Sequence, residues 1–312
     1  MTEQFKTYDI VMIGSGPAAL SAAIYTTRED IDTLLVEKGV IGGLAATTDW
    51  IDNYPGFKDG ISGSMLAEQM RGQAERFGAQ FAMAEVSAIV DEGQIKRLVT
   101  SDGDIRARAV LVATGSDHKK LGIPGEDEYY SRGVHYCATC DGAFYRNKKL
   151  VVIGGGNSAV QEAIFLTRFA SKIELLVRSE LRASDVLLHE LENHKDKISV
   201  RLGVTPVSIE GNDMGVTKLH TRRTQDGRSM SIAMDGIFIF IGLKPNTAFL
   251  KGSPVALDDV GLVTTNSQFE TTMPGVYCAG DVRSGATMQI ASAVGEGATA
   301  ALIMRQWLER SA

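Results

Sequence analysis

One pattern, an apolar strand followed by a glycine-rich turn and an alanine-rich helix, occurs twice in this chain and limits its fold more than any other feature. The first glycine-rich turn is Gly14–Ala19 (GSGPAA), after the apolar run Tyr8–Ile13; the second is Gly154–Ala159 (GGGNSA), after Leu150–Ile153. The pattern G-x-G-x-x-A lets the backbone of a turn approach a pyrophosphate at the N-terminus of the following helix. One copy is weak evidence, but two copies 140 residues apart in the same context indicate an internal repeat.

The second strand of each unit bears on dinucleotide binding. Thr33–Val36 reads as the second strand of the first unit and ends at Glu37, 18 residues beyond Ala19, where a carboxylate can bind the hydroxyls of an adenosine ribose. In the second unit, the corresponding strand Ile173–Val177 ends without an acidic residue. The order of strands and helices predicts an α/β fold with two Rossmann-like, three-layer dinucleotide-binding domains.

The C-terminal section predicts that the second domain is inserted into the first. At about 65 residues, with one apolar strand at Gly275–Ala279 and one mostly apolar helix at Gln289–Glu309, it is too short for a core of its own. We therefore expect residues 1–117 and 245–312 to form the first domain and residues 118–244 to form the second. Further elements are expected as helices at Pro17–Thr27, Ser64–Phe77, Val160–Phe169 and Asp185–Asn193, and as a strand at Ile237–Ile241.

Charge and hydropathy argue against two classes of protein. With 38 acidic and 32 basic residues the formal net charge is −6, whereas a nucleic-acid binder needs a basic face to neutralise phosphates. The chain starts with the polar residues MTEQFK and holds no run of 18 apolar residues, so neither a targeting segment nor a membrane span is expected. We expect a cytoplasmic protein.

A pair of cysteines, Cys137-x-x-Cys140, is followed by Asp141 and lies between the two glycine-rich turns. Two intervening residues put both sulfurs within bonding reach when the second cysteine opens a helix, so the pair can cycle between disulfide and dithiol. The alternative is half of a zinc site, to which His135 could contribute. A fourth ligand is not apparent, since Cys278 lies far along the chain in an apolar run, where it is expected to be a small buried residue. No metal site is predicted.

Taken together, these motifs resemble the low-molecular-weight thioredoxin reductases, FAD-dependent flavoproteins of the pyridine nucleotide-disulfide oxidoreductase class. The resemblance covers nearly the whole chain. Its most specific part is Cys-Ala-Thr-Cys-Asp in the second domain, because relatives such as glutathione reductase have their cysteine pair in the first domain. The motifs that carry the resemblance are, in chain order, Gly14–Ala19, Ala113–Gly115, Cys137–Asp141, Gly154–Ala159 and Ala279–Asp281.

The resemblance implies a thioredoxin-disulfide reductase that passes electrons from NADPH through FAD and the cysteine disulfide to thioredoxin. Cys140 is then the sulfur nearest the flavin, Cys137 attacks the disulfide of thioredoxin, and Asp141 protonates the departing thiolate. Glu37 binds the adenosine of FAD, and Asp281 binds its ribityl chain. The family also implies a homodimer and, as partner, thioredoxin or a thioredoxin-like protein.

The candidate cofactor residues divide between the two domains. In the first domain, the loops Gly42–Leu44 and Asp52–Phe57 contain glycines that could let the backbone approach a flat ligand, although plain turns are an equal reading. The candidates for FAD are Gly14, Ser15, Gly16, Pro17, Ala18, Glu37, Gly43, Leu44, Asn53, Ala113, Thr114, Gly115, Gly280, Asp281 and Gln289. Those for the nicotinamide dinucleotide are Gly154, Gly156, Asn157, Ser158, Ala159, Arg178 and Arg182.

Two departures from the family's pattern concern the cofactors. Members that use NADPH usually have His-Arg-Arg-x-x-x-Arg after the second strand of the second domain, where this chain has the shorter Val177–Arg182 (VRSELR). Because Arg178 and Arg182 remain, we expect NADPH to be preferred over NADH, though by less than the complete motif would give. Many members also have Arg-Gln near the final helix, where this chain has Met288 and Gln289.

Two other functions stay open on the residues alone. One is a related flavin dithiol/disulfide oxidoreductase with another donor or acceptor: NADH, ferredoxin, or oxygen with a small dithiol. The other is a flavin redox sensor, although a sensor has no obvious need for the second glycine-rich turn. For the reductase, the disulfide and the nicotinamide would share one domain while the flavin occupied the other. We therefore expect the stretches near Ser116–His118 and Lys244–Asn246 to act as hinges.

Overall fold

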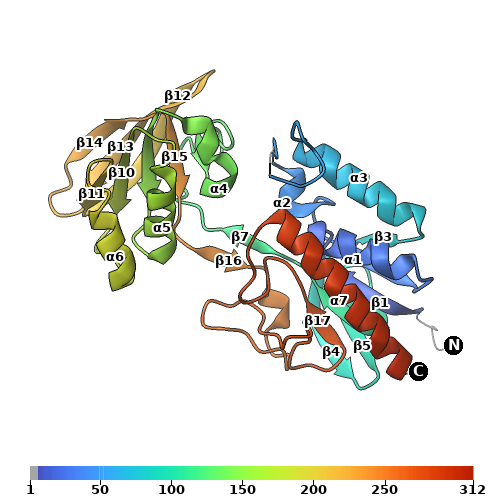
Figure 1. Ribbon diagram of the computed structural model, residues 1–312. Helices are drawn as coiled ribbons and strands as arrows, with labels where there is room; N and C mark the ends of the chain where they lie inside the picture. The colour runs from blue at the N-terminus through green and yellow to red at the C-terminus, as the bar shows by residue number, and fades with distance from the viewer. Residues whose placement is uncertain (1–5, 49, 52, 312) are drawn as a thin grey trace. The chain divides into compact units, whose positions relative to one another are not determined.

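The chain folds as two compact units (Figure 1). In the computed structural model, which describes residues 6–48, 50–51 and 53–311, unit 1 comprises the residues up to Asp117 and from Lys244 onward, and unit 2 comprises His118–Leu243. Lys244 thus belongs to unit 1, whereas the sequence analysis places it in the second domain. Each unit is built on strands paired in parallel and separated by helices, which confirms the expected α/β class.

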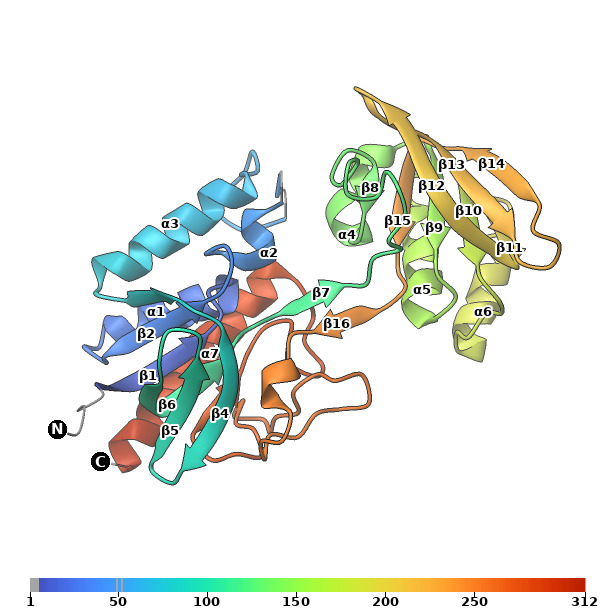
Figure 2. The ribbon, with the colours of Figure 1, turned by 180° about the vertical axis from the view of Figure 1, so that it is seen from behind.

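A seven-stranded sheet forms the centre of unit 1 (Figure 2). The strand order is β3-β2-β1-β6-β5-β4, and β17 pairs with β6; the pairs of β1 with β2 and β6 are parallel, as are β2 with β3 and β6 with β17. The strands are β1 (Thr7–Ile13), β2 (Thr33–Glu37), β3 (Gln80–Met83), β4 (Val86–Glu92), β5 (Ile95–Thr100), β6 (Ile105–Val112) and β17 (Val276–Cys278).

Alternate residues of β1 enter two separate cores of unit 1. Ile10 and Met12 pack with the helices, and Val11 and Ile13 pack into the core that contains residues of β4 and β17. A strand that is buried on both faces consists of consecutive apolar residues, so the apolar residues of β1 predict a strand from the sequence alone. The helices of unit 1 are α1 (Pro17–Thr27), α2 (Gly43–Ala46), α3 (Gly63–Arg76), α7 (Ile290–Arg310) and the 3-10 helix η2 (Ala248–Leu250).

Helix α7 packs closely on α1, although most of the chain separates the two in sequence. A Cβ atom on Gly297 would lie 2.0 Å from the carbonyl oxygen of Ala18, so this approach requires glycine. Nearby, Ser21 Oγ donates a hydrogen bond to the carbonyl oxygen of Val294 at 2.9 Å. The C-terminal section therefore shares one core with the first glycine-rich turn.

Unit 2 has three layers. Its five-stranded sheet has the order β11-β10-β9-β15-β8, with parallel pairing throughout, and lies between helices and a three-stranded antiparallel sheet, β12-β13-β14. In β9, Leu150 and Val152 pack toward α5, whereas Val151 and Ile153 pack toward the antiparallel sheet. The strands are β8 (Val134–His135), β9 (Lys149–Ile153), β10 (Lys172–Val177), β11 (Ile198–Leu202), β12 (Val204–Asn212), β13 (Gly215–Arg223), β14 (Ser229–Ala233) and β15 (Gly236–Ile239). The helices are α4 (Ala138–Asp141), η1 (Gly142–Tyr145), α5 (Asn157–Leu166) and α6 (Asp185–Glu192).

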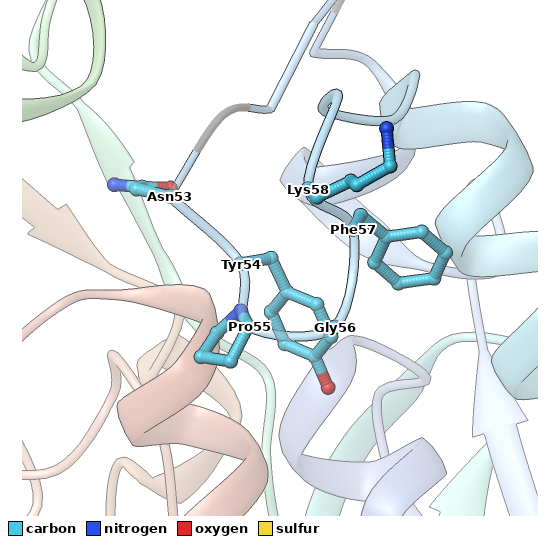
Figure 3. Close-up of a pocket in the computed structure, with 6 residues that line it drawn as sticks. All are labelled: Asn53, Tyr54, Pro55, Gly56, Phe57 and Lys58. Atoms are coloured by element: carbon cyan, nitrogen blue, oxygen red, sulfur yellow. The ribbon is translucent and has the colours of Figure 1, made fainter.

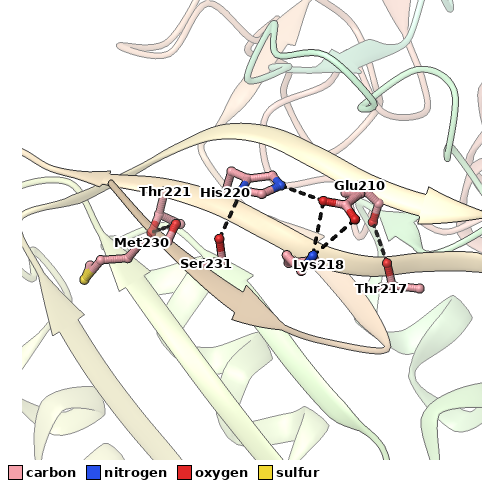
Figure 4. A network of polar contacts seen from close by, with 7 residues as sticks. All are labelled: Glu210, Thr217, Lys218, His220, Thr221, Met230 and Ser231. Carbon is pink, nitrogen blue, oxygen red and sulfur yellow. Dashed lines mark hydrogen bonds and ion pairs between the residues drawn. The ribbon is translucent and has the colours of Figure 1, made fainter. Parts of the chain in front are cut away.

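Polar side chains link the strands of the antiparallel sheet on its outer face (Figure 4). Glu210 Oε2 lies 2.8 Å from His220 Nε2, and Lys218 Nζ lies 3.2 Å from Glu210 Oε1. Ser231 Oγ lies 3.1 Å from the other ring nitrogen of His220. The hydrogen bond from His220, followed by that from Lys218, lowers the pKa of the Glu210 carboxyl. Because side chains alternate between faces, Leu219 of the same sheet points into the core.

Some expected bounds shift in the structure. The helix expected at Val160–Phe169 is α5, which begins at Asn157, because Gly156 already acts as its N-cap. The strand expected at Ile237–Ile241 ends at Ile239. Of the helices in the described residues, none is long and apolar enough to cross a membrane. The chain passes between the units in β7 (Ser116–His118) and β16 (Leu243–Pro245), which pair as a two-stranded sheet.

Candidate functional site

The first glycine-rich turn is shaped to expose its backbone at the start of α1. Gly14 has φ +98°, and a Cβ atom there would lie 2.5 Å from the carbonyl oxygen of Ala113, so only glycine fits. Gly16 is the N-cap of α1, and a Cβ atom on it would meet no atom within 4 Å. The space beside Gly16, at the N-terminus of an 11-residue helix that begins with Pro17, suits an anionic group such as a pyrophosphate.

The second turn repeats this geometry in unit 2. Gly154 has φ +145°, and its Cβ atom would lie 2.3 Å from the carbonyl oxygen of Phe240. Gly156 caps α5, and a Cβ atom on it would again meet nothing within 4 Å. In both units the first glycine of the turn allows close packing against the residue that follows a central strand, and the glycine two positions later leaves the backbone open to a ligand. Both turns therefore fit dinucleotides.

The two turns differ in the residue at the end of the neighbouring strand. In unit 1 this residue is Glu37, whose carboxylate accepts hydrogen bonds from the N–H and Oγ of Ser15 at 2.9 and 2.8 Å and from the N–H of Gly39 at 2.8 Å. In unit 2 the last residue of β10 is Val177, and a Cβ atom on Gly155 would lie 2.7 Å from Val177 Cγ1. The second turn thus has an apolar contact where the first has a carboxylate.

The loop after β10 donates hydrogen bonds from its backbone N–H groups to residues of the second turn. The N–H of Arg182 donates to the carbonyl oxygen of Gly155 at 2.6 Å, and the N–H of Ser184 donates to Asn157 Oδ1 at 2.8 Å. The side chains of Glu180 and Arg182 are exposed, and Arg182 Nε lies 3.4 Å from Glu180 Oε1. The loop therefore lies at the turn, but one of its basic side chains is paired with an acid. Arg178 is exposed.

Two more segments of unit 1 lie at the first turn: the start of α2 and the stretch Ala113–Gly115. A Cβ atom on Gly43 would lie 3.5 Å from Gly16 Cα, which places the start of α2 beside the turn, with Leu44 exposed. Ala113 contacts Gly14, as described above, and begins the stretch to Gly115, which has φ +68°. Thr114, between these two residues, donates a hydrogen bond from Oγ1 to the carbonyl oxygen of Asn246 at 2.8 Å.

Gly280 and Asp281 approach the first turn from β17. Gly280 has φ +76°, a Cβ atom on it would lie 3.0 Å from Ala18 Cβ, and its N–H donates to Glu296 Oε2 at 2.8 Å. Arg283 forms an ion pair with Glu296, which fixes the same segment. Burial raises the pKa of the Asp281 carboxyl, and the charge of Glu296 raises it further. A half-buried carboxylate whose charge is disfavoured in this way needs hydrogen-bond donors, such as ligand hydroxyls.

Asn53 and Gln289 are brought together although they are far apart in the sequence. Asn53 Nδ2 donates to Gln289 Oε1 at 3.1 Å, and Gln289 Nε2 donates to the carbonyl oxygen of Met288 at 3.0 Å. Met288 itself has φ +57°, an uncommon conformation for a residue with a side chain. Residues Asn53 to Lys58 line a pocket of about 460 Å³ (Figure 3). Asp52, also part of the expected ligand loop, lies outside the described residues.

Cys137 and Cys140 form a disulfide, with their Cα atoms 5.3 Å apart. The expectation that the second cysteine opens a helix is wrong: Cys137 is the N-cap of α4, and its Sγ accepts from the N–H of Cys140 at 3.2 Å. Cys140 is exposed and Cys137 is half-buried, so the pair is accessible. Cys278 is fully buried in β17, and burial raises the pKa of its thiol. Among the described residues, no group of three or more His, Cys, Asp or Glu residues could hold a metal ion.

The structure also reveals a cluster of His135, Asp141 and Tyr145 next to the cysteine pair in the sequence, which the sequence analysis missed. His135 Nδ1 lies 3.2 Å from Asp141 Oδ2, and His135 Nε2 lies 2.6 Å from the hydroxyl of Tyr145. The sequence analysis considers His135 only as a metal ligand and gives Tyr145 no role. Only the short spacing between the three residues could have suggested this cluster.

Comparisons with known proteins agree with this geometry. Residues 8–297 match the family described as pyridine nucleotide-disulphide oxidoreductase. The thioredoxin reductase of Listeria monocytogenes is 39% identical over 310 residues, which cover 99% of this chain and 96% of the relative. That of Bacillus subtilis is 38% identical over 311 residues, covering 99% and 97%. Among solved structures, thioredoxin reductase from Streptococcus pyogenes has a TM-score of 0.92 at 39% identity, covering 97% of this chain and 99% of that one. Thioredoxin reductase from Lactococcus lactis, in what is described as the FR conformation, has a TM-score of 0.66 at 39% identity and the same coverage.

Proposed function

Because the chain belongs to the pyridine nucleotide-disulphide oxidoreductase family, we propose that it is a thioredoxin-disulfide reductase that uses FAD and NADPH. The observation that supports this most strongly is the accessible Cys137–Cys140 disulfide in a unit that also has a dinucleotide-type turn. A flavin redox sensor would have no use for that second turn.

We place FAD in unit 1. When bound, FAD takes a hydride from a nicotinamide and passes two electrons on to a disulfide. Gly14–Ala18 would hold the pyrophosphate at the N-terminus of α1, and Glu37 would accept a hydrogen bond from the adenosine ribose. Asp281 would accept hydrogen bonds from ribityl hydroxyls, which supplies the donors that its half-buried carboxylate needs. Asn53 and Gln289, already hydrogen-bonded to one another, would present amides to the flavin.

NADPH is the nucleotide that we place at the second turn. A site for NADH usually ends the second strand with an acid that binds the ribose hydroxyls, and Val177 cannot do this. Arg178 and Arg182 follow instead, on a loop hydrogen-bonded to Gly155 and Asn157. Arginine suits the 2′-phosphate of NADPH, because its planar group binds phosphate oxygens through two parallel hydrogen bonds.

The cysteine pair would carry out the exchange with thioredoxin. After reduction, the Cys137 thiolate attacks one sulfur of the thioredoxin disulfide; the thioredoxin S–S bond breaks, a mixed disulfide forms, and the departing thiolate takes a proton from Asp141. The Cys140 thiolate then attacks Cys137, which restores the Cys137–Cys140 disulfide and releases the second thioredoxin sulfur. We further propose a homodimer in the cytoplasm, on the strength of the family resemblance.

The test of this function uses the purified protein and its two cysteine variants. The parent should be yellow with one FAD per chain, and NADPH should bleach the flavin under anaerobic conditions. Cys137→Ser and Cys140→Ser should each abolish the reduction of thioredoxin, because the transfer is serial, while NADPH still bleaches their flavin. Substantial thioredoxin turnover by either variant would contradict the proposal. Parallel titrations with NADH and reduced ferredoxin, and an assay for peroxide, separate the alternative donors and the oxidase.

A further inference from the structure

Asp141 occupies a place where its side chain needs external support. It is the last residue of α4, a helix of four residues, and its N–H donates to the carbonyl oxygen of Cys137 at 3.2 Å. The neighbouring cysteines change between a bonded and an open form in each catalytic cycle. The Asp141 side chain has 23% of its surface exposed, so its orientation through that change depends on the groups that cover it.

His135 supplies a fixed contact to this carboxylate. Its ring is buried, with 6% of its surface exposed, and stacks on Phe238 with ring centroids 5.1 Å apart. β8, which contains His135, pairs with β15, which contains Phe238, so the ring is anchored to the central sheet of unit 2. From that position His135 Nδ1 lies 3.2 Å from Asp141 Oδ2.

The Asp141 carboxylate decides which ring nitrogen of His135 carries the proton, and Tyr145 lies at the other nitrogen. An ionised carboxylate can only accept, so Nδ1 carries the hydrogen that faces Asp141, and Nε2 is left as an acceptor. The Tyr145 hydroxyl lies 2.6 Å from Nε2, and with this tautomer it donates to that nitrogen. Burial raises the pKa of Tyr145, and the charges of Asp141 and Asp235 raise it further, so the hydroxyl stays protonated. The result is a chain of two hydrogen bonds, Tyr145 to His135 to Asp141.

We propose that His135 is a positioning residue for disulfide exchange: it orients the Asp141 carboxylate toward the redox pair and stabilises the negative charge that remains after Asp141 has delivered its proton. In that step the O–H bond of Asp141 breaks, an S–H bond forms on the departing thiolate, and no other reactant is needed. A hydrogen bond to a charged acceptor is stronger than one to a neutral acceptor, so the contact with His135 strengthens as the proton leaves. This inference rests on the proposed reductase function and on Asp141 as its acid.

Three substitutions test the role of the His135 N–H group that faces Asp141. His135→Leu keeps the bulk but removes the N–H; because misplacement of a reacting group by about 1 Å can cost a hundredfold in rate, we expect the turnover of thioredoxin to fall about tenfold or more. His135→Asn keeps a side-chain N–H and should recover most of that loss. Tyr145→Phe keeps the ring but frees Nε2, and should give a smaller loss. For all three, the rate at which NADPH bleaches the flavin should equal that of the parent.

The matched control is Tyr136→Phe. Tyr136 is the next residue in the chain, is also buried, and loses a buried hydrogen bond to Glu126 of 2.7 Å, but this bond does not involve Asp141. Its turnover should match that of the parent. If Tyr136→Phe slows turnover as much as His135→Leu, the effect is a general disturbance of the segment and the proposal fails.

A double-variant comparison separates positioning from a merely structural role. In an Asp141→Asn background, His135→Leu should change the residual turnover less than about twofold, because a residue that acts through Asp141 has nothing left to orient. Full additivity of the two losses would overturn the proposal. If His135→Leu does not fold with its flavin, Tyr145→Phe in the same background gives the same comparison. A parent that fails to reduce thioredoxin refutes the proposed function instead, and the role of His135 is then read from reduction of a small aromatic disulfide.

Discussion

The ionised carboxyl of Asp281 should lower the stability of the folded protein but favour the binding of a ligand with hydroxyl groups. Burial, and then the charge of Glu296, raise the pKa of its carboxyl from the ordinary value of 3.8, so folding disfavours the ionised form. The stability associated with this group is therefore fully present below the unfolded-state pKa and is lost as the pH rises through the raised value. Near neutral pH the flavin-free protein carries a destabilising charge that a bound ligand with hydroxyl donors would relieve.

The variant Asp281→Asn separates these two effects. Without its flavin, the variant should unfold at a higher urea concentration than the parent at pH 7, and the difference should shrink as the pH approaches 3.8. Its affinity for FAD should fall by about one to two powers of ten, since hydrogen bonds to a charged group contribute about 1.5–3 kcal/mol. Urea titrations at both pH values and fluorescence titration with FAD measure the two outcomes. Equal midpoints at pH 7 would show that the half-buried charge has no effect on stability.

In the proposed function, nucleotide preference should depend on Glu180 and Arg182, whose Oε1 and Nε atoms lie 3.4 Å apart. Exposed ion pairs contribute only about 0–1 kcal/mol, whereas a charge-assisted phosphate contact contributes about 1.5–3 kcal/mol, so the pairing should weaken the binding of a 2′-phosphate without abolishing it. We expect the parent to prefer NADPH, Glu180→Gln to prefer it by a few-fold more, and Arg178→Ala/Arg182→Ala to lose the preference. The measurement is kcat/KM with NADPH and NADH for all three proteins. Equal use of both nucleotides by the parent, or an unchanged ratio in the double variant, would rule out these arginines as the phosphate site.

Among the elements, α7 packs on α1 beside the first glycine-rich turn, where we propose that FAD binds. An added Cβ atom on Gly297 would lie 2.0 Å from the carbonyl oxygen of Ala18, so Gly297→Ala must push the two helices apart. We expect a loss of about 1–3 kcal/mol in the free energy of unfolding, as for other overpacked sites, together with weaker FAD binding. Gly295→Ala is the control on the same helix, because a Cβ atom there meets nothing within 4 Å; it should be neutral or gain up to about 1 kcal/mol. Identical effects of the two substitutions in a urea titration would refute the packing argument.

The elements also show where reasoning from sequence succeeds and where it stops. The turns at Gly14 and Gly154 were predictable, because the need for positive φ and for close backbone approach is local and leaves a fixed spacing of glycines. Contacts between residues that are far apart in the chain produce no such local pattern in the sequence. The hydrogen bond of Asn53 to Gln289 depends on how α7 packs, and the orientation of His135 depends on stacking against a strand far along the chain. The cap of α4 at Cys137 was misjudged for a related reason, since four residues carry too little periodicity to locate a helix boundary.

At the scale of the whole molecule, two short connections join the units. In each unit, a backbone hydrogen bond links the two connections to each other. In unit 1, the N–H of Asn246 donates to the carbonyl oxygen of Gly115 at 3.1 Å; in unit 2, the N–H of Lys119 donates to the carbonyl oxygen of Gly242 at 3.0 Å. Any change in orientation must therefore be taken up between these two bonds. The residues between them are Ser116–His118 and Leu243–Pro245.

The proposed function requires a change of orientation, because one flavin would serve two groups. In the proposed function the disulfide and the nicotinamide both belong to unit 2, while the flavin belongs to unit 1, and the two groups cannot react at the flavin at the same moment. The solved relatives from Streptococcus pyogenes and Lactococcus lactis are equally identical to this chain but match it with TM-scores of 0.92 and 0.66. Because the two relatives are equally similar to this chain in sequence but superpose on it unequally, their structures differ from each other in overall arrangement.

We therefore predict that joining the two units covalently stops turnover but spares one half-reaction. One exposed residue in each unit is replaced by cysteine, and the oxidised protein, in which Cys137 and Cys140 are protected as a disulfide and Cys278 is buried, is treated with a bifunctional thiol reagent. A short linker should leave either the bleaching of the flavin by NADPH or the transfer of electrons between flavin and disulfide at its normal rate, and should slow the other by about tenfold or more, as expected when a closure step limits the rate. A long, flexible linker at the same two positions is the control and should restore turnover, because it permits the swing. Full turnover with the short linker would show that electrons pass between the units without any movement at the two connections.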